Sequence, residues 1–269
     1  MLKQDTNHGV RSVLRSTNII SCLSKNINTL NEIAEKCGIK TSTAYRILKT
    51  LELVDFVTQD PRSHRYYLGP AIIELSADSK ATHQYLIICA QEEMRALNNM
   101  FKEAILLSIL VDVRLIHLFE LQGTSGLRVV EDSKGRGQPF IGATAKILLA
   151  QLADEQIKSI LDNIKIAPLT ENSVTDKEEL LSQVLTARRQ GYAISYGERV
   201  QGALGISSPV LNYIYPAVLT MVGAEQSMRP DLEALLEGVT RSTERISKKL
   251  KNIFPHIESS RTKKVYVKS

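Results

Sequence analysis

The segment from residue 29 to residue 68 constrains the fold more than any other part of the chain. Thr29 and Glu32 form a capping-box pattern, in which a hydroxyl and a carboxylate satisfy free amides at the start of a helix. Gly38 predicts the end of this helix, because glycine readily adopts the left-handed conformation found there. A second short helix and a β-hairpin are expected to follow. This order of elements is typical of a winged helix-turn-helix.

The helix after Gly38 is predicted to have one buried and one exposed face. Thr41 or Ser42 is expected to cap its start. Apolar residues recur at helical spacing on the buried face, namely Ala44, Ile47, Leu48 and Leu51. The other face is polar, cationic and aromatic, which favours contact with base edges and phosphates in a major groove. We therefore expect DNA contacts from Ser42, Thr43, Tyr45, Arg46 and Lys49.

A hairpin with a basic tip is expected to complete this DNA-binding unit. Residues 53–58 and 66–68 are predicted strands, because both segments are rich in β-branched and aromatic residues. Turn-forming residues lie between them, and the expected contacts of this wing are Arg62, His64 and Arg65. Upstream, a first core helix is predicted from the spacing of Val10, Val13, Leu14, Thr17, Ile20 and Leu23.

The chain of 269 residues is longer than this unit needs, so a second and larger domain is expected. Two clusters of strands separated by helices predict a mostly antiparallel sheet flanked by helices, which places the chain in the α+β class. The expected strands cover residues 103–111, 113–121, 127–130, 192–195, 204–209 and 215–222.

Composition narrows the possible classes of protein. No run of about 18 apolar residues and no signal-peptide core is present, so we expect a cytoplasmic protein without a membrane contact. The net charge is +5, and the excess of basic residues lies toward the two ends of the chain, as expected if one part binds nucleic acid. Cys22, Cys37 and Cys89 lack metal-ligand spacing, which favours buried thiols over disulfides or zinc. No cofactor is expected.

Several motifs, taken in their order, resemble the IclR family of bacterial transcription regulators. They are VRSVLRS at 10–16, LNEIA at 30–34, STAYRILKTL at 42–51, YYLG at 66–69, and later Gly191-Tyr192-Ala193 with Gly197-Glu198. The resemblance implies a winged helix-turn-helix domain at 8–70, a helical linker at 71–84 and a GAF-like effector-binding domain at 85–252, before a basic tail at 253–269. It also implies homodimers that often pair into tetramers, and a small organic ligand on the concave side of the sheet.

The resemblance further implies which residues line the effector site. FIGATAK at 140–146 matches the family's ligand-facing helix start, which places Gly142, Ala143 and Thr144 there, although Ala145 replaces the usual glycine. Ser195 stands where the family often has an acidic residue. Free amides at a helix start favour an anion and hydroxyls offer neutral hydrogen bonds, so a small carboxylate or sugar acid fits best. The remaining strand positions are Ala203, Gly205, Thr220 and Val222.

Each of these residues also has a purely structural reading. Gly142 and Gly205 can serve only a turn and close strand packing, and Thr144 can serve only as a helix cap. His117 stands alone within an apolar strand, which favours a core histidine over a catalytic base. The apolar face of the helix after residue 83 fits either a dimer surface or a cover for the sheet, through Leu86, Ile87, Ala90 and Met94.

Two functions are compatible with these observations. The first is a regulator, either repressor or activator, that binds a palindromic DNA operator as a homodimer and responds to a small organic acid. The second is an enzyme acting on a small organic acid, with an accessory N-terminal helical module. The metalloprotease, nucleophile-elbow, phosphate-loop and dinucleotide motifs are all missing, so no catalytic residue is expected.

Overall fold

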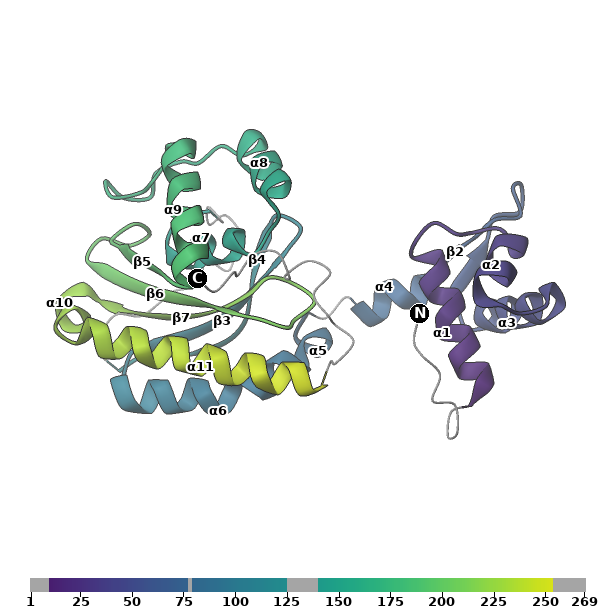
Figure 1. Cartoon of the computed structure of the whole chain (residues 1–269), viewed down its shortest axis with the longest axis horizontal. Coiled ribbons are helices and arrows are strands. Elements are labelled where there is room, and N and C mark those ends of the chain that lie inside the picture. Colours follow the sequence, from purple (N-terminus) through teal and green to yellow (C-terminus); the bar gives the residue numbers. More distant parts are fainter. Residues whose placement is uncertain (1–9, 77–78, 125–139, 254–269) are drawn as a thin grey trace. The chain divides into compact units, whose positions relative to one another are not determined.

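The computed structural model describes residues 10–76, 79–124 and 140–253. It divides into two compact units, Met1–Thr82 and His83–Ser269 (Figure 1). The strand expected at 127–130 and nearly all of the basic tail expected at 253–269 lie outside the described residues. The finer domain limits, including the linker at 71–84, stay predictions. Within the described ranges, no helix is both long and apolar enough to cross a membrane.

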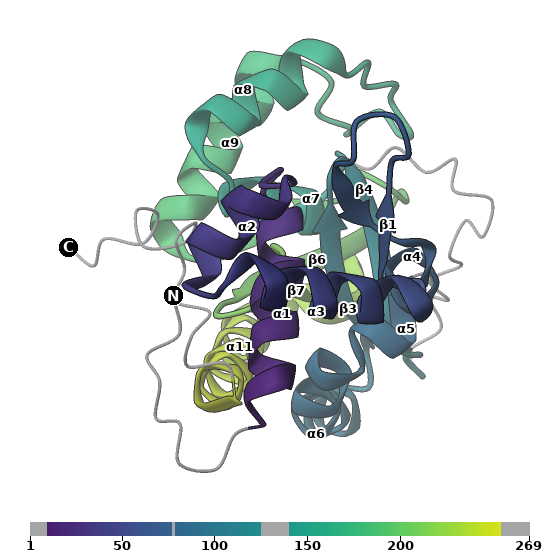
Figure 2. The ribbon, with the colours of Figure 1, turned by 90° about the vertical axis from the view of Figure 1, so that its right-hand side faces the viewer.

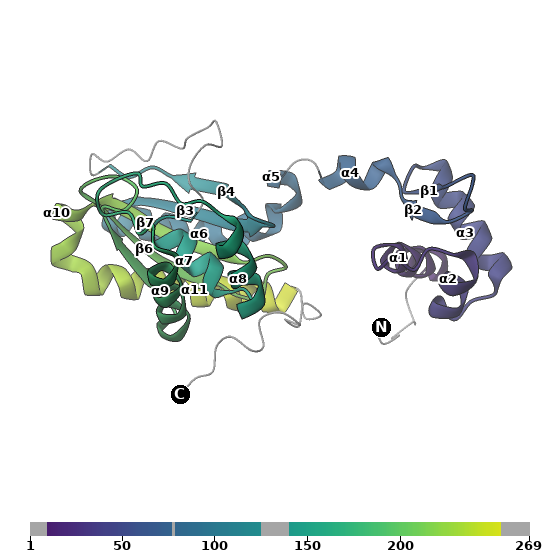
Figure 3. The ribbon, with the colours of Figure 1, turned by 90° about the horizontal axis from the view of Figure 1, so that it is seen from above.

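The first unit combines short helices with a two-stranded antiparallel hairpin that lies beside α1 and α3 (Figure 3). Thr29 caps α2 as predicted, since its hydroxyl accepts the Glu32 amide and the Glu32 carboxylate accepts the Thr29 amide. Gly38 ends α2 in the left-handed conformation, with φ of 63°. The elements are α1 Arg11–Leu23, α2 Leu30–Cys37, α3 Thr41–Leu53, β1 Val57–Gln59, β2 Tyr66–Leu68, α4 Pro70–Ser76 and α5 Ser79–Thr82.

One apolar core joins the helices and the hairpin of this unit. Ile19 of α1, Ile33 of α2 and Leu48 of α3 are fully buried in it, together with Tyr66 of β2. Burying each such side chain contributes about 1.5–3 kcal/mol. The Tyr66 amide also donates to the carbonyl of Asn28 at 2.8 Å, which ties the hairpin to the loop before α2. The core therefore fixes the hairpin relative to the helix pair.

Two expectations for the edges of α3 are wrong. The residue before the helix is Lys40, which makes no side-chain cap, so neither Thr41 nor Ser42 caps α3. The helix also continues to Leu53, and β1 begins only at Val57. Leu53, expected at the start of a strand, thus completes the last turn of the helix instead.

The buried face of α1 also differs from the prediction. Val10, just before the helix, and Val13 are more than half exposed, and Leu14 is also exposed. The helix extends beyond its partners at its N-terminal end, so only its later turns pack against α2 and α3. The residues of α1 that are buried are Ile19, Cys22 and Leu23.

The second unit is built on a five-stranded antiparallel sheet in the order β4-β3-β7-β6-β5. This confirms the predicted α+β architecture. Helices α6 and α11 lie side by side on one face of the sheet, and α7 and α9 lie on the other (Figure 1, Figure 2). The strands are β3 Ala104–Val111, β4 Arg114–Leu121, β5 Ala193–Tyr196, β6 Ala203–Val210 and β7 Ala217–Ala224. The helices are α6 Gln84–Phe101, α7 Ala143–Ala150, α8 Asp154–Asn163, α9 Lys177–Gln190, α10 Glu225–Met228, the 3-10 turn η1 Arg229–Asp231 and α11 Leu232–Ile253.

The two faces of this sheet contribute to different apolar clusters. Because side chains alternate along a strand, Leu107 faces the cluster of α6 and α11, whereas Leu110 faces that of α7. The apolar face of α6 is buried in the first cluster, so these residues cover the sheet and do not form an exposed dimer surface. They are Leu86, Ile87, Ala90 and Met94.

Candidate nucleic-acid interface and effector site

The expected DNA contacts on α3 lie together on the outer face of the first unit. Ser42, Tyr45 and Arg46 are exposed and Thr43 is half-buried. Tyr45 keeps 46% of its surface exposed, so it is not part of the buried core. The amine of Lys49 lies 5.9 Å from the centre of its ring. This face therefore presents hydroxyl, aromatic and cationic groups to solvent.

Lys49 differs from Arg46 because its charge is already compensated within the unit. Its amine donates to the Glu52 carboxylate at 2.7 Å and to the Gln59 amide oxygen at 3.4 Å. The hydrogen bond to Glu52 raises the pKa of Lys49. Arg46 has no ion pair among the residues that the structure describes. Arg46 is therefore the stronger candidate for a direct base or phosphate contact.

The tip of the hairpin is shaped by Asp60, which the sequence pattern predicts only as a turn residue. Its carboxylate accepts the amides of Arg62 at 3.2 Å and Ser63 at 3.1 Å, and the Ser63 hydroxyl donates to it as well. These hydrogen bonds lower the pKa of Asp60, with the Ser63 hydroxyl as the main cause. His64 follows with a positive φ of 55°. The result is an ordered tip on which Arg62 and His64 are both exposed.

Arg65 is anchored at the base of the wing. Its guanidinium donates to the Asn28 side-chain oxygen at 3.0 Å. Arg65 is otherwise exposed, and a guanidinium has five N–H donors, so further donors remain for a phosphate. Arg65 thus both fixes the hairpin and presents a positive charge.

In the second unit, the sheet brings most of the expected effector residues to one place. Ser195 of β5 pairs with Gly205 of β6, which pairs with Val222 of β7. A Cβ atom built on Gly205 would lie 3.0 Å from the Ser195 hydroxyl and 4.0 Å from both Val222 Cγ2 and Ala143 Cβ. The first residue of α7 therefore lies over this row of strand residues.

Gly142 completes the cluster from the start of α7. It is the residue before the helix and has φ of 92°, a conformation that favours glycine. A Cβ atom there would lie 3.8 Å from the Ser195 hydroxyl and 3.3 Å from Arg199 Cδ. Ala203 lies two residues before Gly205 in β6, paired with Ala224, and thus at the margin of the cluster.

Thr220 and Thr144 belong to a separate chain of hydroxyls. The two Oγ1 atoms are 2.9 Å apart, and Thr220 Oγ1 is 2.8 Å from the hydroxyl of Ser207. These hydroxyls bind one another and form a wall of the site. Ser195 is different, because its side chain is only 9% exposed yet has no hydrogen-bond partner in the described part of the chain.

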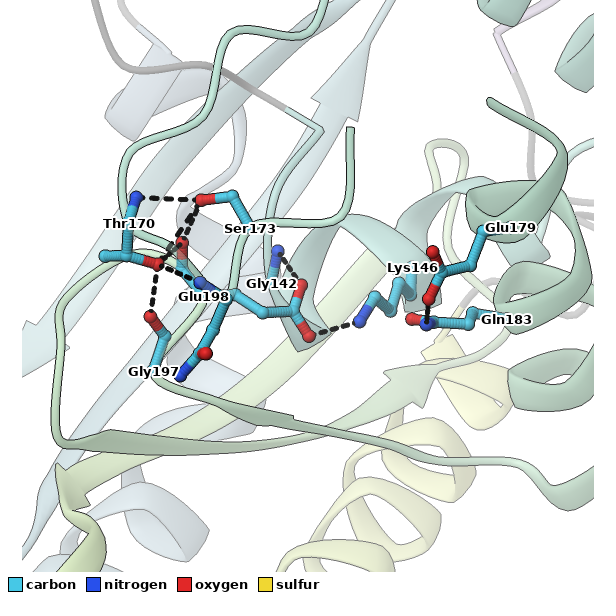
Figure 4. A network of polar contacts seen from close by, with 9 residues as sticks. Gly142, Lys146, Thr170, Ser173, Glu179, Gln183, Gly197 and Glu198 are labelled. Carbon is cyan, nitrogen blue, oxygen red and sulfur yellow. Dashed lines mark hydrogen bonds and ion pairs between the residues drawn. The ribbon is translucent and has the colours of Figure 1, made fainter. Parts of the chain in front are cut away.

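Glu198 and Lys146 form a buried ion pair that the sequence reading did not place in the site (Figure 4). Glu198 accepts the Gly142 amide at 3.2 Å and the Lys146 amine at 2.5 Å. The hydroxyls of Thr170 and Ser173 donate to the Glu198 carbonyl at 3.1 and 2.7 Å. Glu198 and Lys146 both lie inside motifs that carry the family resemblance. That resemblance was the one sequence signal that could have indicated them.

This ion pair corrects one part of the expected chemistry. The amides of residues 142–144 were all expected to be free, but the Gly142 amide already binds the Glu198 carboxylate. The next two amides, those of Ala143 and Thr144, begin α7 and have no acceptor within the described residues. Of the amides of residues 142–144, those of Ala143 and Thr144 therefore remain for an anion.

The other candidate reactive group, His117, is held by a contact within the sheet. His117 Nδ1 lies 2.8 Å from the hydroxyl of the fully buried Ser108 on the neighbouring strand. In the described ranges, no group of three or more His, Cys, Asp or Glu side chains is placed to hold a metal ion.

The winged helix-turn-helix unit followed by an antiparallel α+β unit defines a class of protein, the transcription regulators with a winged-helix DNA-binding unit. Two family models match the chain, the IclR helix-turn-helix domain at residues 12–61 and the bacterial transcriptional regulator IclR C-terminal domain at residues 79–248. The chain belongs to the IclR family of bacterial transcriptional regulators, and it is a DNA-binding regulator and not an enzyme.

Individual relatives agree with this assignment. The chain is 28% identical to the HTH-type transcriptional regulator KdgR of Escherichia coli K12 over 204 residues, which cover 76% of this chain and 77% of that protein. It is 26% identical to the HTH-type transcriptional regulator KipR of Bacillus subtilis over 247 residues, which cover 89% of this chain and 97% of that protein. The crystal structure of an IclR regulator from Alicyclobacillus acidocaldarius matches with a TM-score of 0.55 and 28% identity, covering 90% of this chain and all of that one.

Proposed function

We propose that this regulator binds a small organic acid at the start of α7, and that the bound acid changes its affinity for a DNA operator. The observation that carries the proposal is a set of buried polar groups without partners at one place. The Ser195 hydroxyl and the amides of Ala143 and Thr144 have no partner among the described residues. Buried polar groups usually have a hydrogen-bond partner, so a ligand is the natural one here.

The chemistry of these groups supports a carboxylate or a sugar acid. Amides at the start of a helix point outward with partial positive charge and bind carboxylates well. The Ser195 hydroxyl can bind either a carboxylate oxygen or a ligand hydroxyl. The Lys146 amine lies one helical turn inside and balances the charge of Glu198, so the pair as a whole does not repel an incoming anion.

The small residues at the site favour a small ligand. The cluster contains two residues without side chains, Gly142 and Gly205, beside the small Ala143. The hydroxyls of Thr144 and Thr220 bond to each other and line one side of the site, and Val222 adds an apolar surface. A compact acid of a few carbon atoms matches this combination of two amides, one hydroxyl and small neighbours.

We also propose that the protein binds a palindromic operator as a homodimer, which can pair further into a tetramer. One recognition helix reads only a few base pairs, whereas two related helices on two half-sites read a longer sequence. Exposed apolar residues at the N-terminal end of α1 and on α4 support a self-association surface in the first unit: Val10, Val13, Leu14, Ile73 and Leu75. A regulator of bacterial genes acts where the chromosome is, so we place it in the cytoplasm.

The test is a ligand screen on the full-length chain followed by a DNA titration. Small carboxylates and sugar acids are screened for an increase in melting temperature, which rises with occupancy when a ligand binds only the folded state. An active compound is then added to the protein bound to a duplex that the protein has selected from a random pool. The proposal requires both a thermal shift and a change in DNA affinity. Thermal shifts that persist in Ser195→Ala, or no change in DNA affinity, would contradict it.

A further inference from the structure

Cys22 and Cys37 lie side by side in the first unit. Their sulfur atoms are 3.7 Å apart, although the residues are separated by 15 positions in the sequence. Cys22 is buried on the inner face of α1, and Cys37 is the half-buried last residue of α2. The packing of α1 against α2 creates this pair, and the sequence spacing gave no sign of it. Cys89 belongs to α6 in the second unit.

The two thiols are close enough to be joined by a small movement. A disulfide requires a sulfur–sulfur distance of about 2.05 Å, so the two atoms must approach by about 1.7 Å. Cys37 is in the last turn of α2, where a helix most easily adjusts, and it is partly accessible to solvent. Geometry therefore permits a bond without unfolding the unit.

We infer that Cys22 and Cys37 form an oxidisable dithiol site that a peroxide converts to an intrachain disulfide. The accessible Cys37, as thiolate, attacks one oxygen of hydrogen peroxide, an S–O bond forms and the O–O bond breaks, and the departing hydroxide leaves as water. Cys22 then attacks the sulfenic sulfur, the S–S bond forms and the S–O bond breaks, releasing a second water. Two thiols lose two electrons in total, and one peroxide becomes two molecules of water.

The surroundings of the pair slow its oxidation. Burial, together with the neighbouring Cys22 thiol, raises the pKa of Cys37 to about 11. Few thiolates are present at neutral pH, so the first step is slow with mild oxidants and requires a sustained or strong one.

The disulfide would act on the turn that positions the recognition helix. Gly38 follows Cys37 with φ of 63°, and the turn is held by Gly38 N to Glu35 O at 3.1 Å and Ile39 N to Ala34 O at 3.0 Å. Lys40 follows as the residue before α3, which begins at Thr41. Drawing Cys37 toward α1 shifts this turn, and α3 with it. We expect weaker DNA binding in the oxidised protein, because base contacts depend on the position of α3.

The first experiment detects the bond. Full-length protein is treated with hydrogen peroxide, denatured, alkylated and digested without reduction for mass spectrometry. Two of the three thiols should be lost from one chain, as a peptide pair linking Cys22 to Cys37. Cys89→Ser should still form this link and serves as the matched control, whereas Cys22→Ser and Cys37→Ser should not form it. Over-oxidation of Cys37 alone, or a link between two chains, would overturn the inference.

The second experiment measures the consequence for DNA. The probe is a duplex selected from a random pool by the reduced wild-type protein. Oxidation should lower the affinity of wild type and Cys89→Ser about tenfold, equivalent to one or two lost base contacts, and dithiothreitol should restore it. Cys22→Ser should keep its affinity under peroxide, and Cys22→Ala replaces it if the serine variant does not fold. A disulfide that forms without changing DNA affinity would refute the effect on α3.

Discussion

Glu198 and Lys146 are 52 positions apart in the sequence and form an ion pair inside the effector domain, with Oε1 2.5 Å from Nζ. The two side chains are only 8% and 4% exposed. Removing one partner of such a pair leaves a buried charge without compensation, which costs far more than the pair itself contributes.

We therefore expect Glu198→Gln to lower the free energy of unfolding by about 3 kcal/mol or more, because Lys146 is left charged and buried. The double variant Glu198→Gln with Lys146→Met should recover much of this loss. Glutamine can still accept the Gly142 amide, so the start of α7 keeps its hydrogen bond. Urea unfolding of the full-length chain measures both effects. A single variant as stable as wild type would mean that the pair is hydrated and not buried.

Ser195→Ala should separate recognition from stability. The Ser195 hydroxyl has no partner among the described residues, so its loss should change the free energy of unfolding by less than about 0.5 kcal/mol while it weakens effector binding. Thr220→Val should instead destabilise by about 1–2 kcal/mol, since it leaves the Thr144 and Ser207 hydroxyls without their bond. Melting curves measure the stability of the two variants, and ligand titrations measure their effector binding. Equal losses of stability would count against the division of roles.

Gly205→Ala should block the effector site with little effect on folding. The added Cβ atom would lie 3.0 Å from the Ser195 hydroxyl, which must give way by a few tenths of an ångström, and 4.0 Å from Ala143 Cβ. It would occupy the space between these groups without straining the backbone. Gly142→Ala is the contrasting variant, because φ of 92° makes any side chain there costly. Effector binding measured by calorimetry should be lost in Gly205→Ala at nearly unchanged melting temperature; a normal affinity would place the ligand elsewhere.

Arg46→Ala and Arg62→Ala should weaken DNA binding in different ways. Arg46 is exposed on α3, so its loss should cost about 1–3 kcal/mol on the selected duplex and relax sequence preference. Arg62 is exposed on the wing tip ordered by Asp60, so its loss should lower affinity for all sequences and reduce the salt dependence. Competition binding at several salt concentrations distinguishes the two. Unchanged selectivity in Arg46→Ala would show that α3 is not the reading helix.

Stability should fall on mild acidification because of His83. Burial lowers the pKa of this ring below its ordinary value of 6.5, and Nδ1 lies 2.6 Å from the Tyr213 hydroxyl. Above pH 6.5 the ring is neutral in both states and stability is complete. As the pH falls below 6.5, the unfolded chain takes up a proton that the folded one resists, so stability is lost down to the lower, folded-state pKa. Unfolding of His83→Gln should depend less on pH below 6.5 than that of wild type, which urea unfolding at several pH values measures. Equal pH dependence in the two proteins would contradict this.

Local signals in the sequence were enough for much of the fold. The Thr29 capping box, the Gly38 helix end and the antiparallel sheet are confirmed, because each depends on neighbouring residues or on simple alternation. The prediction for the start of α3 was wrong, since the residue before the helix is Lys40 and it makes no side-chain cap. A capping pattern predicts the start of a helix only where local hydrogen bonds determine that start.

Contacts between distant segments were beyond a single sequence. The Glu198–Lys146 pair joins a loop after β5 to α7, and the Cys22–Cys37 pair joins two helices. Neither spacing carries a pattern, because tertiary packing alone decides which side chains meet. The expected effector residues were assigned from the family resemblance. Their roles stay a prediction until a ligand is found.

The sheet of the second unit has one face sealed by α6 and α11 and another that carries hydroxyls and glycines beneath α7. Along one strand, Ile206 belongs to the first face while Gly205 and Ser207 belong to the second. Neighbouring residues of β6 thus belong to two different faces of the sheet. Substitutions at the positions of β6 that face α7 therefore leave the apolar cluster under α6 and α11 unchanged. A domain built this way can change the chemistry of one face of its sheet while it keeps the core on the other face.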